Sequence, residues 1–82
     1  MEEFERIVEY SYNPKHQCFV VRFLDGSSYT LLIKDLPKKL QTKKPDWEHS
    51  QLNAQQNGVL VQAGSDLREI PFNIVHSRGR VL

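Results

Sequence analysis

An Asp-Gly pair at positions 25 and 26 separates two runs of β-branched and aromatic residues, and it constrains the fold more than any other feature. The two runs are residues 18–24 and 27–34. Glycine adopts positive φ angles without steric cost, so Asp-Gly between strand-forming runs is a strong signal for a tight turn. The sequence therefore predicts an antiparallel β-hairpin over residues 18–34.

Two loop lengths are compatible with this turn, and each gives the hairpin different faces. A three-residue loop over 24–26, with Gly26 in the left-handed conformation, places Val21 opposite Tyr29. A two-residue loop places Arg22 there instead, and both faces then mix polar and apolar side chains. Because a half-buried sheet needs one apolar face, we favour the three-residue loop. The inner face would then carry Phe19, Val21, Phe23, Tyr29, Leu31 and Ile33.

The opposite face of the hairpin is polar apart from Val20 and Leu32. Apolar side chains on an otherwise solvated face need cover, which either the chain's own helix or a partner would supply. Trp47, the only tryptophan, is expected to be at least half buried at the sheet edge. It serves either as a packing residue or as an anchor for a partner. We therefore take Val20, Leu32 and Trp47 as candidate partner-binding residues.

A first strand is expected over residues 6–12, which the Asn-Pro turn at 13–16 joins to the hairpin. Simple alternation along this strand would place Ile7 on the face opposite to Tyr10. The first strand and the hairpin together predict a meander of three antiparallel strands. Such a sheet is stable when another element covers its apolar face.

A short helix over residues 36–41 is expected to provide that cover. Asp35 suits the N-cap, and Pro37 suits the first helical turn, where an amide hydrogen is not needed. Leu36 and Leu40 are four residues apart, so both side chains would point at the sheet.

A second hairpin is predicted from strands at 59–63 and 67–70 around a turn at 64–66. Pro71 would close the return strand or place it at a sheet edge, because proline cannot donate to the ladder. Residues 72–76 fit either a short strand or a single helical turn, and the chain would end in an irregular tail.

These elements predict an α+β domain that occupies residues 1–82: an antiparallel sheet of about five strands with one short helix packed on it. The sheet would consist of the meander and the second hairpin, and a partly closed small barrel is the alternative architecture. A chain of 82 residues provides one domain and buries only about 60–65% of its unfolded surface. A dimer or a partner protein would therefore help to cover apolar patches.

Composition and motifs disfavour several classes of function. The net charge of +1 creates no strong field, and no run approaches the roughly 18 apolar residues of a membrane helix. The acidic N-terminus lacks the apolar core of a signal peptide, so we expect a cytoplasmic protein without a membrane partner. The chain has one cysteine, Cys18, three widely spaced histidines and no phosphate-binding or nucleophile motif. We therefore expect a non-catalytic protein without a cofactor or a metal.

Positive charge is concentrated in two segments of the chain. If the predicted helix and the C-terminal turn lie on one side, these side chains form a basic stripe that can hold phosphates. The other interpretation is a solvated helix face that keeps the protein soluble. The candidate nucleic-acid-binding residues are Lys38, Lys39, Lys43, Lys44, Arg78 and Arg80.

Residues 19–26 and 31–36 resemble the opening hairpin of a small bacterial family of unknown function, in which strand, Asp-Gly, strand and Asp-Leu follow one another. Residues 58–61 and 64–67 are similar to the second unit of that family, although Gln62 and Ala63 stand where its members usually carry a tryptophan. The resemblance implies a compact α+β domain, sometimes fused to a helix-turn-helix or encoded near toxin–antitoxin genes. It implies no catalytic residues.

The most economical functional hypothesis is an interaction module that docks on another protein or associates with a second copy of itself. It depends on the small core and on the apolar residues of the outer hairpin face. The alternative hypothesis is a nucleic-acid-binding domain that uses the basic stripe.

Overall fold

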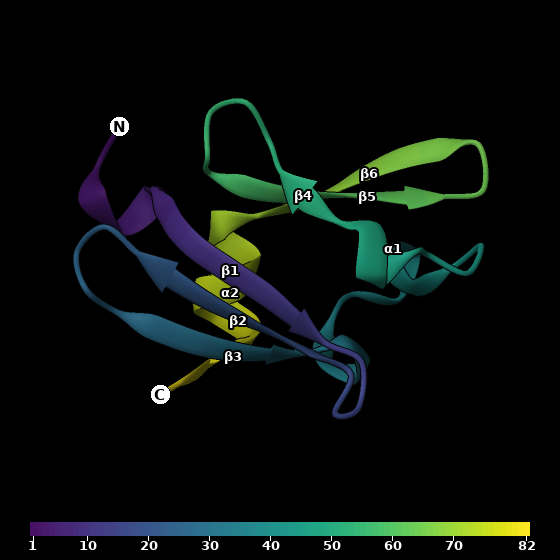
Figure 1. Cartoon of the computed structure of the whole chain (residues 1–82), viewed down its shortest axis with the longest axis horizontal. Coiled ribbons are helices and arrows are strands. Elements are labelled where there is room, and N and C mark those ends of the chain that lie inside the picture. Colours follow the sequence, from purple (N-terminus) through teal and green to yellow (C-terminus); the bar gives the residue numbers. More distant parts are fainter.

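The computed structural model describes all residues from 1 to 82, and it confirms the α+β class. Seven strands form two antiparallel sheets that do not close into a barrel (Figure 1). The four-stranded sheet has the order β1-β2-β3-β7, and its strands are β1 (Ile7–Asn13), β2 (Cys18–Phe23), β3 (Ser28–Leu32) and β7 (Arg80–Val81). The three-stranded sheet has the order β4-β5-β6, and its strands are β4 (Gln51–Leu52), β5 (Gly58–Ala63) and β6 (Asp66–Pro71).

The central hairpin of β2 and β3 forms with the predicted register. Val21 pairs with Tyr29, and the Phe23 amide donates to the Ser27 carbonyl over 2.9 Å. Gly26 has a φ of 91°, as the three-residue loop requires. Four of the six predicted inner-face side chains are fully buried, namely Phe19, Val21, Phe23 and Leu31.

β1 completes the predicted meander, but simple alternation along it is wrong. The register with β2 shifts between Ile7 and Glu9, which is the signature of a bulge at Val8. The extra residue brings the buried Ile7 onto the same face as Tyr10 and Tyr12, which pack against the core. A bulge leaves no clear mark in a short alternating sequence, which is why the side assignment failed.

The predicted helix is shorter than expected, since α1 comprises only Lys38–Gln41. Asp35 does not cap it. Ile33–Asp35 continue from β3 as a 3₁₀ turn, η2, and Pro37 occupies the N-cap position. Proline disfavours a helical conformation in the residue before it, and Leu36 is accordingly extended. Leu36 and Leu40 nevertheless reach the core, with 3% and 8% of their surfaces exposed.

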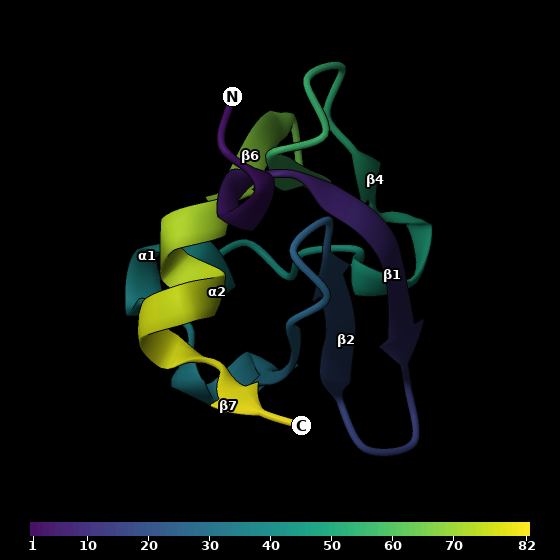
Figure 2. The same ribbon diagram turned by 90° about the vertical axis from the view of Figure 1, so that its left-hand side faces the viewer.

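The longest helix is α2 (Phe72–Arg78), so the helical interpretation of this segment was right and the strand interpretation wrong. After α2 the chain turns at Gly79, where a Cβ atom would collide with the Val75 carbonyl oxygen and lie 3.2 Å from Tyr29 Cβ. This close approach lets β7 pair with β3, in place of the expected irregular tail. Figure 2 shows α1 and α2 on the same side of the molecule.

One buried cluster joins the two sheets and both helices. The ten buried residues of the cluster are Ile7, Phe19, Val21, Phe23, Leu31, Leu36, Leu40, Val59, Ile70 and Val75. Because both sheets contribute to the cluster, the core sets their positions relative to each other.

The helices are short. None of them is long and apolar enough to cross a membrane.

Candidate functional site

The outer edge of β1 carries backbone groups that no strand of this chain uses. The backbone amide of Phe23 points to β3. The backbone N–H and C=O groups of the even-numbered residues of β2 therefore point to β1. Val20 pairs with Ser11, whose N–H and C=O therefore face β2. Tyr10 and Tyr12 lie on either side of Ser11, and alternation directs their N–H and C=O groups away from the sheet.

The start of this edge is already occupied. The Ile7 amide donates to the Gln56 carbonyl over 2.7 Å, so the loop before β5 covers the first part of β1. The open part of the edge is therefore the stretch from Tyr10 to Tyr12.

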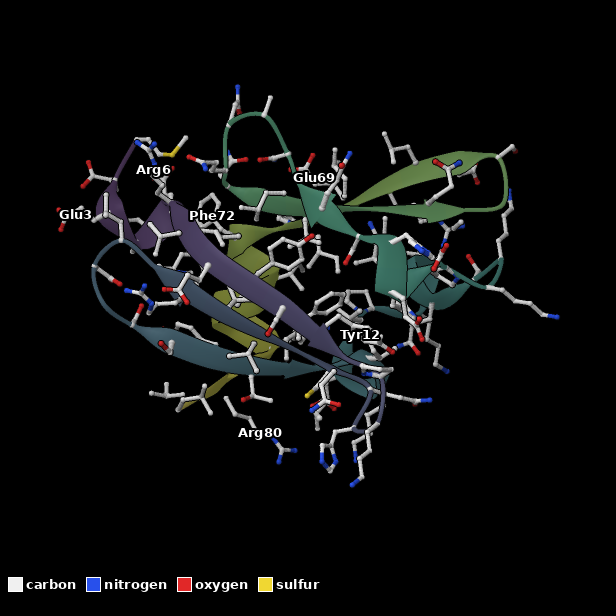
Figure 3. The ribbon with its side chains drawn as sticks, viewed as in Figure 1. Glu3, Arg6, Tyr12, Glu69, Phe72 and Arg80 are labelled. Carbon is white, nitrogen blue, oxygen red and sulfur yellow. The ribbon has the colours of Figure 1, made fainter.

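A groove of about 390 Å³ runs beside this open stretch. One wall is β1, and the other is the 3₁₀ turn η3 (Trp47–His49) with the residue that follows it. The Tyr10 hydroxyl donates to the Ser50 carbonyl and so ties the two walls together. Figure 3 shows Tyr12 at the far end of β1. The residues that line the groove are Tyr10, Ser11, Tyr12, Pro14, Glu48 and Ser50.

Aromatic packing supports the groove from the core side. The rings of Tyr12 and Phe19 lie 5.1 Å apart, and the Trp47 ring meets Phe19 edge-on at 5.9 Å. Trp47 is thus only partly exposed and packs against the core, as the packing interpretation expected. Trp47 is the first residue of the turn that forms one wall, and its ring anchors that turn to Phe19.

Val20 and Leu32 occupy the outer face of the four-stranded sheet, away from Trp47. Val20 in β2 pairs with Thr30 in β3, and Leu32 lies two residues after Thr30 in β3. Val20 is 37% exposed and Leu32 is half-buried. The three candidate partner-binding residues therefore do not form one surface.

Glu48 supplies the one carboxylate that lines the groove, and it is exposed. Burial raises the pKa of the Tyr12 hydroxyl above its usual value of 10.0, and the nearby Glu48 carboxylate raises it further. Both effects disfavour the negatively charged phenolate. Glu48 forms no ion pair with any cation of the chain.

The basic residues lie in two neighbourhoods. Arg78 donates to the Asp35 carbonyl over 3.4 Å, and Arg80 lies 3.9 Å from the Asp35 carboxylate, so the C-terminal arginines flank the segment that enters α1. Lys43 is paired with Asp66 at 2.8 Å. The candidate cations that form no ion pair are Lys38, Lys39, Lys44 and Arg78.

His76 has a structural role that the sequence did not indicate. Its ring stacks on Phe23 with centroids 4.3 Å apart, and Nδ1 lies 3.0 Å from the Tyr29 hydroxyl. Nε2 lies 2.7 Å from the Phe4 carbonyl oxygen and must donate to it, because a carbonyl only accepts. The ring thus fastens the N-terminal turn to α2 and the sheet. No three His, Cys, Asp or Glu side chains lie close enough together to hold a metal.

Sequence reasoning missed the groove residues Tyr10, Tyr12 and Glu48. The alternating Tyr-Ser-Tyr of β1 indicated a strand, but only the strand order reveals that this strand is an edge. Compared with family models, curated proteins and solved structures, the chain matches none.

Proposed function

We propose that this protein is a non-catalytic interaction module that binds an extended segment of another protein along β1, between Tyr10 and Tyr12. The observation that carries the proposal is the pair of outward-facing backbone units beside a groove. In strand addition, backbone hydrogen bonds supply affinity and neighbouring pockets supply specificity. The β1 edge offers both.

The short edge is suited to transient binding. Tyr10 and Tyr12 together offer four backbone hydrogen bonds, each worth about 0.5–1.5 kcal/mol net of competition with water. Association costs several kcal/mol in lost freedom, so contacts in the groove must add to these bonds. We therefore expect dissociation constants that are about micromolar or weaker.

A second copy of the chain can supply the added strand, and this special case makes the module a homodimer. Two β1 edges would then pair antiparallel about a two-fold axis. Sedimentation at increasing concentration separates the two cases, because only self-association increases the mass of the pure protein.

Replacement of Tyr12 by proline tests the proposal, because proline removes one outward N–H without breaking the ladder to β2. Tyr12→Ala is the matched control, since it also loses the ring but keeps the amide. The probe is a phage library of random nonapeptides. We expect peptides enriched on Tyr12→Ala to bind Tyr12→Pro at least tenfold more weakly, because these two variants both lack the ring and differ in the amide hydrogen. Equal binding to both variants, or no enrichment on the wild-type protein, would contradict strand addition.

Nucleic-acid binding is the second candidate, and it is supported by the exposed, unpaired Lys38 and Lys39 of α1. Retention on DNA at about 50 mM salt that is lost in the double variant Lys38→Glu, Lys39→Glu would favour it.

A further inference from the structure

Glu48 is the one carboxylate at the groove that lacks a cationic partner within the chain. The nearby carboxylates of Asp46, which lies 2.8 Å from His49 Nδ1, and of Glu9, which pairs with Arg22, do not line the groove. The Glu48 carboxylate also lies close enough to Tyr12 to raise the pKa of its hydroxyl. The Glu48 carboxylate and the Tyr12 ring beside it are therefore available to bind a cation of another molecule.

The polar groups of the groove are not equally available to a ligand. The Tyr10 hydroxyl already donates a hydrogen bond to the Ser50 carbonyl, and this bond crosses the groove beside Tyr10. The Tyr12 hydroxyl forms no hydrogen bond within the chain. The free groups thus gather at the Tyr12 end, and the space beside Tyr10 suits only a small side chain.

We infer that the groove selects an extended peptide with an arginine, seated between the Tyr12 ring and the Glu48 carboxylate. This inference rests on the proposed strand addition at β1. In a paired strand, the residue opposite Tyr12 directs its side chain to the same face of the sheet as Tyr12 does. The arginine is therefore the residue paired with Tyr12, and the residue paired with Tyr10 is small.

Arginine fits these two groups better than lysine does. Its planar guanidinium stacks on an aromatic ring and donates two parallel hydrogen bonds to a carboxylate. Contact of a cation with a ring adds to the attraction where water is partly excluded. Replacement of the arginine by glutamine in a bound peptide is expected to weaken binding roughly tenfold.

A charge swap tests the inference. The random nonapeptide library is selected in parallel on the wild-type protein and on Glu48→Lys, with Glu2→Lys as a control that makes the same charge change at the exposed N-terminus. Glu48 is exposed and unpaired, so all three proteins should fold, and thermal melting checks this. We expect arginine at one fixed position on the wild-type protein and on Glu2→Lys, and aspartate or glutamate at that position on Glu48→Lys.

The outcomes separate this inference from the proposed function. Enriched peptides that share no basic position, or that remain the same on Glu48→Lys, would overturn the arginine site while strand addition stands. Failure to enrich any peptide on the wild-type protein would overturn both. A shift in the Tyr12 hydroxyl titration to lower pH on addition of an enriched peptide would place its cation beside Tyr12, and an unchanged titration would contradict that placement.

Discussion

The two sheets each end in one long edge strand, β1 in the first and β6 in the second. Both strands direct the backbone N–H and C=O groups of two residues outward. On β1 these residues are Tyr10 and Tyr12. On β6 they are Leu67 and Glu69, because the backbone groups of Arg68 between them face β5. The two edges are therefore similar as hydrogen-bonding templates.

Their surroundings differ. The open part of β1 lies beside a groove of about 390 Å³ with a second wall, whereas none of the hollows in the surface touches β6. β6 ends at Pro71, which lacks an amide hydrogen, and it carries the charge of Glu69 and an exposed Leu67. Proline and charge are common protections of edge strands against unwanted pairing. The comparison shows that a free edge becomes a specific site only when another element supplies walls.

The largest expected effect comes from proline at Ser11, the one position between the two outward tyrosines. Ser11→Pro removes an amide that pairs into β2, and it should lower the free energy of unfolding by about 3 kcal/mol. Ser11→Ala controls for the lost hydroxyl and should change stability little. Chemical denaturation measures both. If Ser11→Pro is no more destabilising than Tyr12→Pro, the assignment of inward and outward amides on β1 is wrong.

A second test addresses the hairpin that holds β1 in register. Gly26 has nothing within 4 Å of the position of an added Cβ, so a substitution there acts through its φ of 91° alone. Gly26→Val should cost about 2 kcal/mol, because a β-branched residue strongly disfavours positive φ. Gly26→Asn should cost less, since asparagine tolerates this region. Thermal melting compares the two, and equal melting temperatures would refute the turn geometry.

A smaller effect is expected when the bridge across the groove is removed. Tyr10→Phe deletes the hydroxyl that donates to the Ser50 carbonyl, and it should cost about 1 kcal/mol in unfolding free energy. Amide hydrogen exchange should quicken in residues 50–52 and remain unchanged in β6. If the variant changes the exchange rates of residues 50–52 and of β6 equally, the bridge does not hold the second wall.

The smallest expected effect is the stability that the carboxylates of the two hairpin turns lose in acid. The pKa of Asp66, where β6 begins, lies below its ordinary value of 3.8 because the Lys43 ammonium donates to it and attracts its charge. The pKa of Asp25 is lowered mainly by the Ser27 hydroxyl. A lowered folded-state pKa gives stability that is present above pH 3.8 and is lost as the pH falls through the folded value.

Carboxyl NMR titrations separate the two turns. Lys43→Met should return the pKa of Asp66 toward 3.8 and leave that of Asp25 low, and Ser27→Ala should do the reverse. A parallel change in both groups would show that long-range charge, and not the local contacts, sets these values.

Local chemistry made the central hairpin predictable to the residue. Gly26 supplies the positive φ of the turn, and the alternation of apolar side chains selects one register over the other. The same local rules failed where a tertiary contact decided the outcome. The last residues form β7 only because Gly79 approaches Tyr29 closely. The late start of α1 has a local cause that the helix prediction overlooked, because Pro37 disfavours a helical conformation in Leu36.

The candidate site lay beyond these rules. Trp47 was correctly expected to pack near a sheet edge, but the residues that line the groove come from segments almost forty positions apart in the chain, Tyr10 and Glu48 among them. The pairing of Tyr10 with Val21 and of Tyr12 with Phe19 also had to place both tyrosines on the core face before either could line it.

The residues alone were enough to predict the five longer strands, the tight turns and the apolar face of the central hairpin, because these depend on the φ preferences of single residues and on the two-residue period of a strand. The packing of the whole chain makes β1 an edge, leaves its amides at Tyr10 and Tyr12 without a partner strand and places Glu48 across the groove from them. Whether a backbone group is satisfied depends on which strand lies beside it, and the burial of the shared core sets that neighbour.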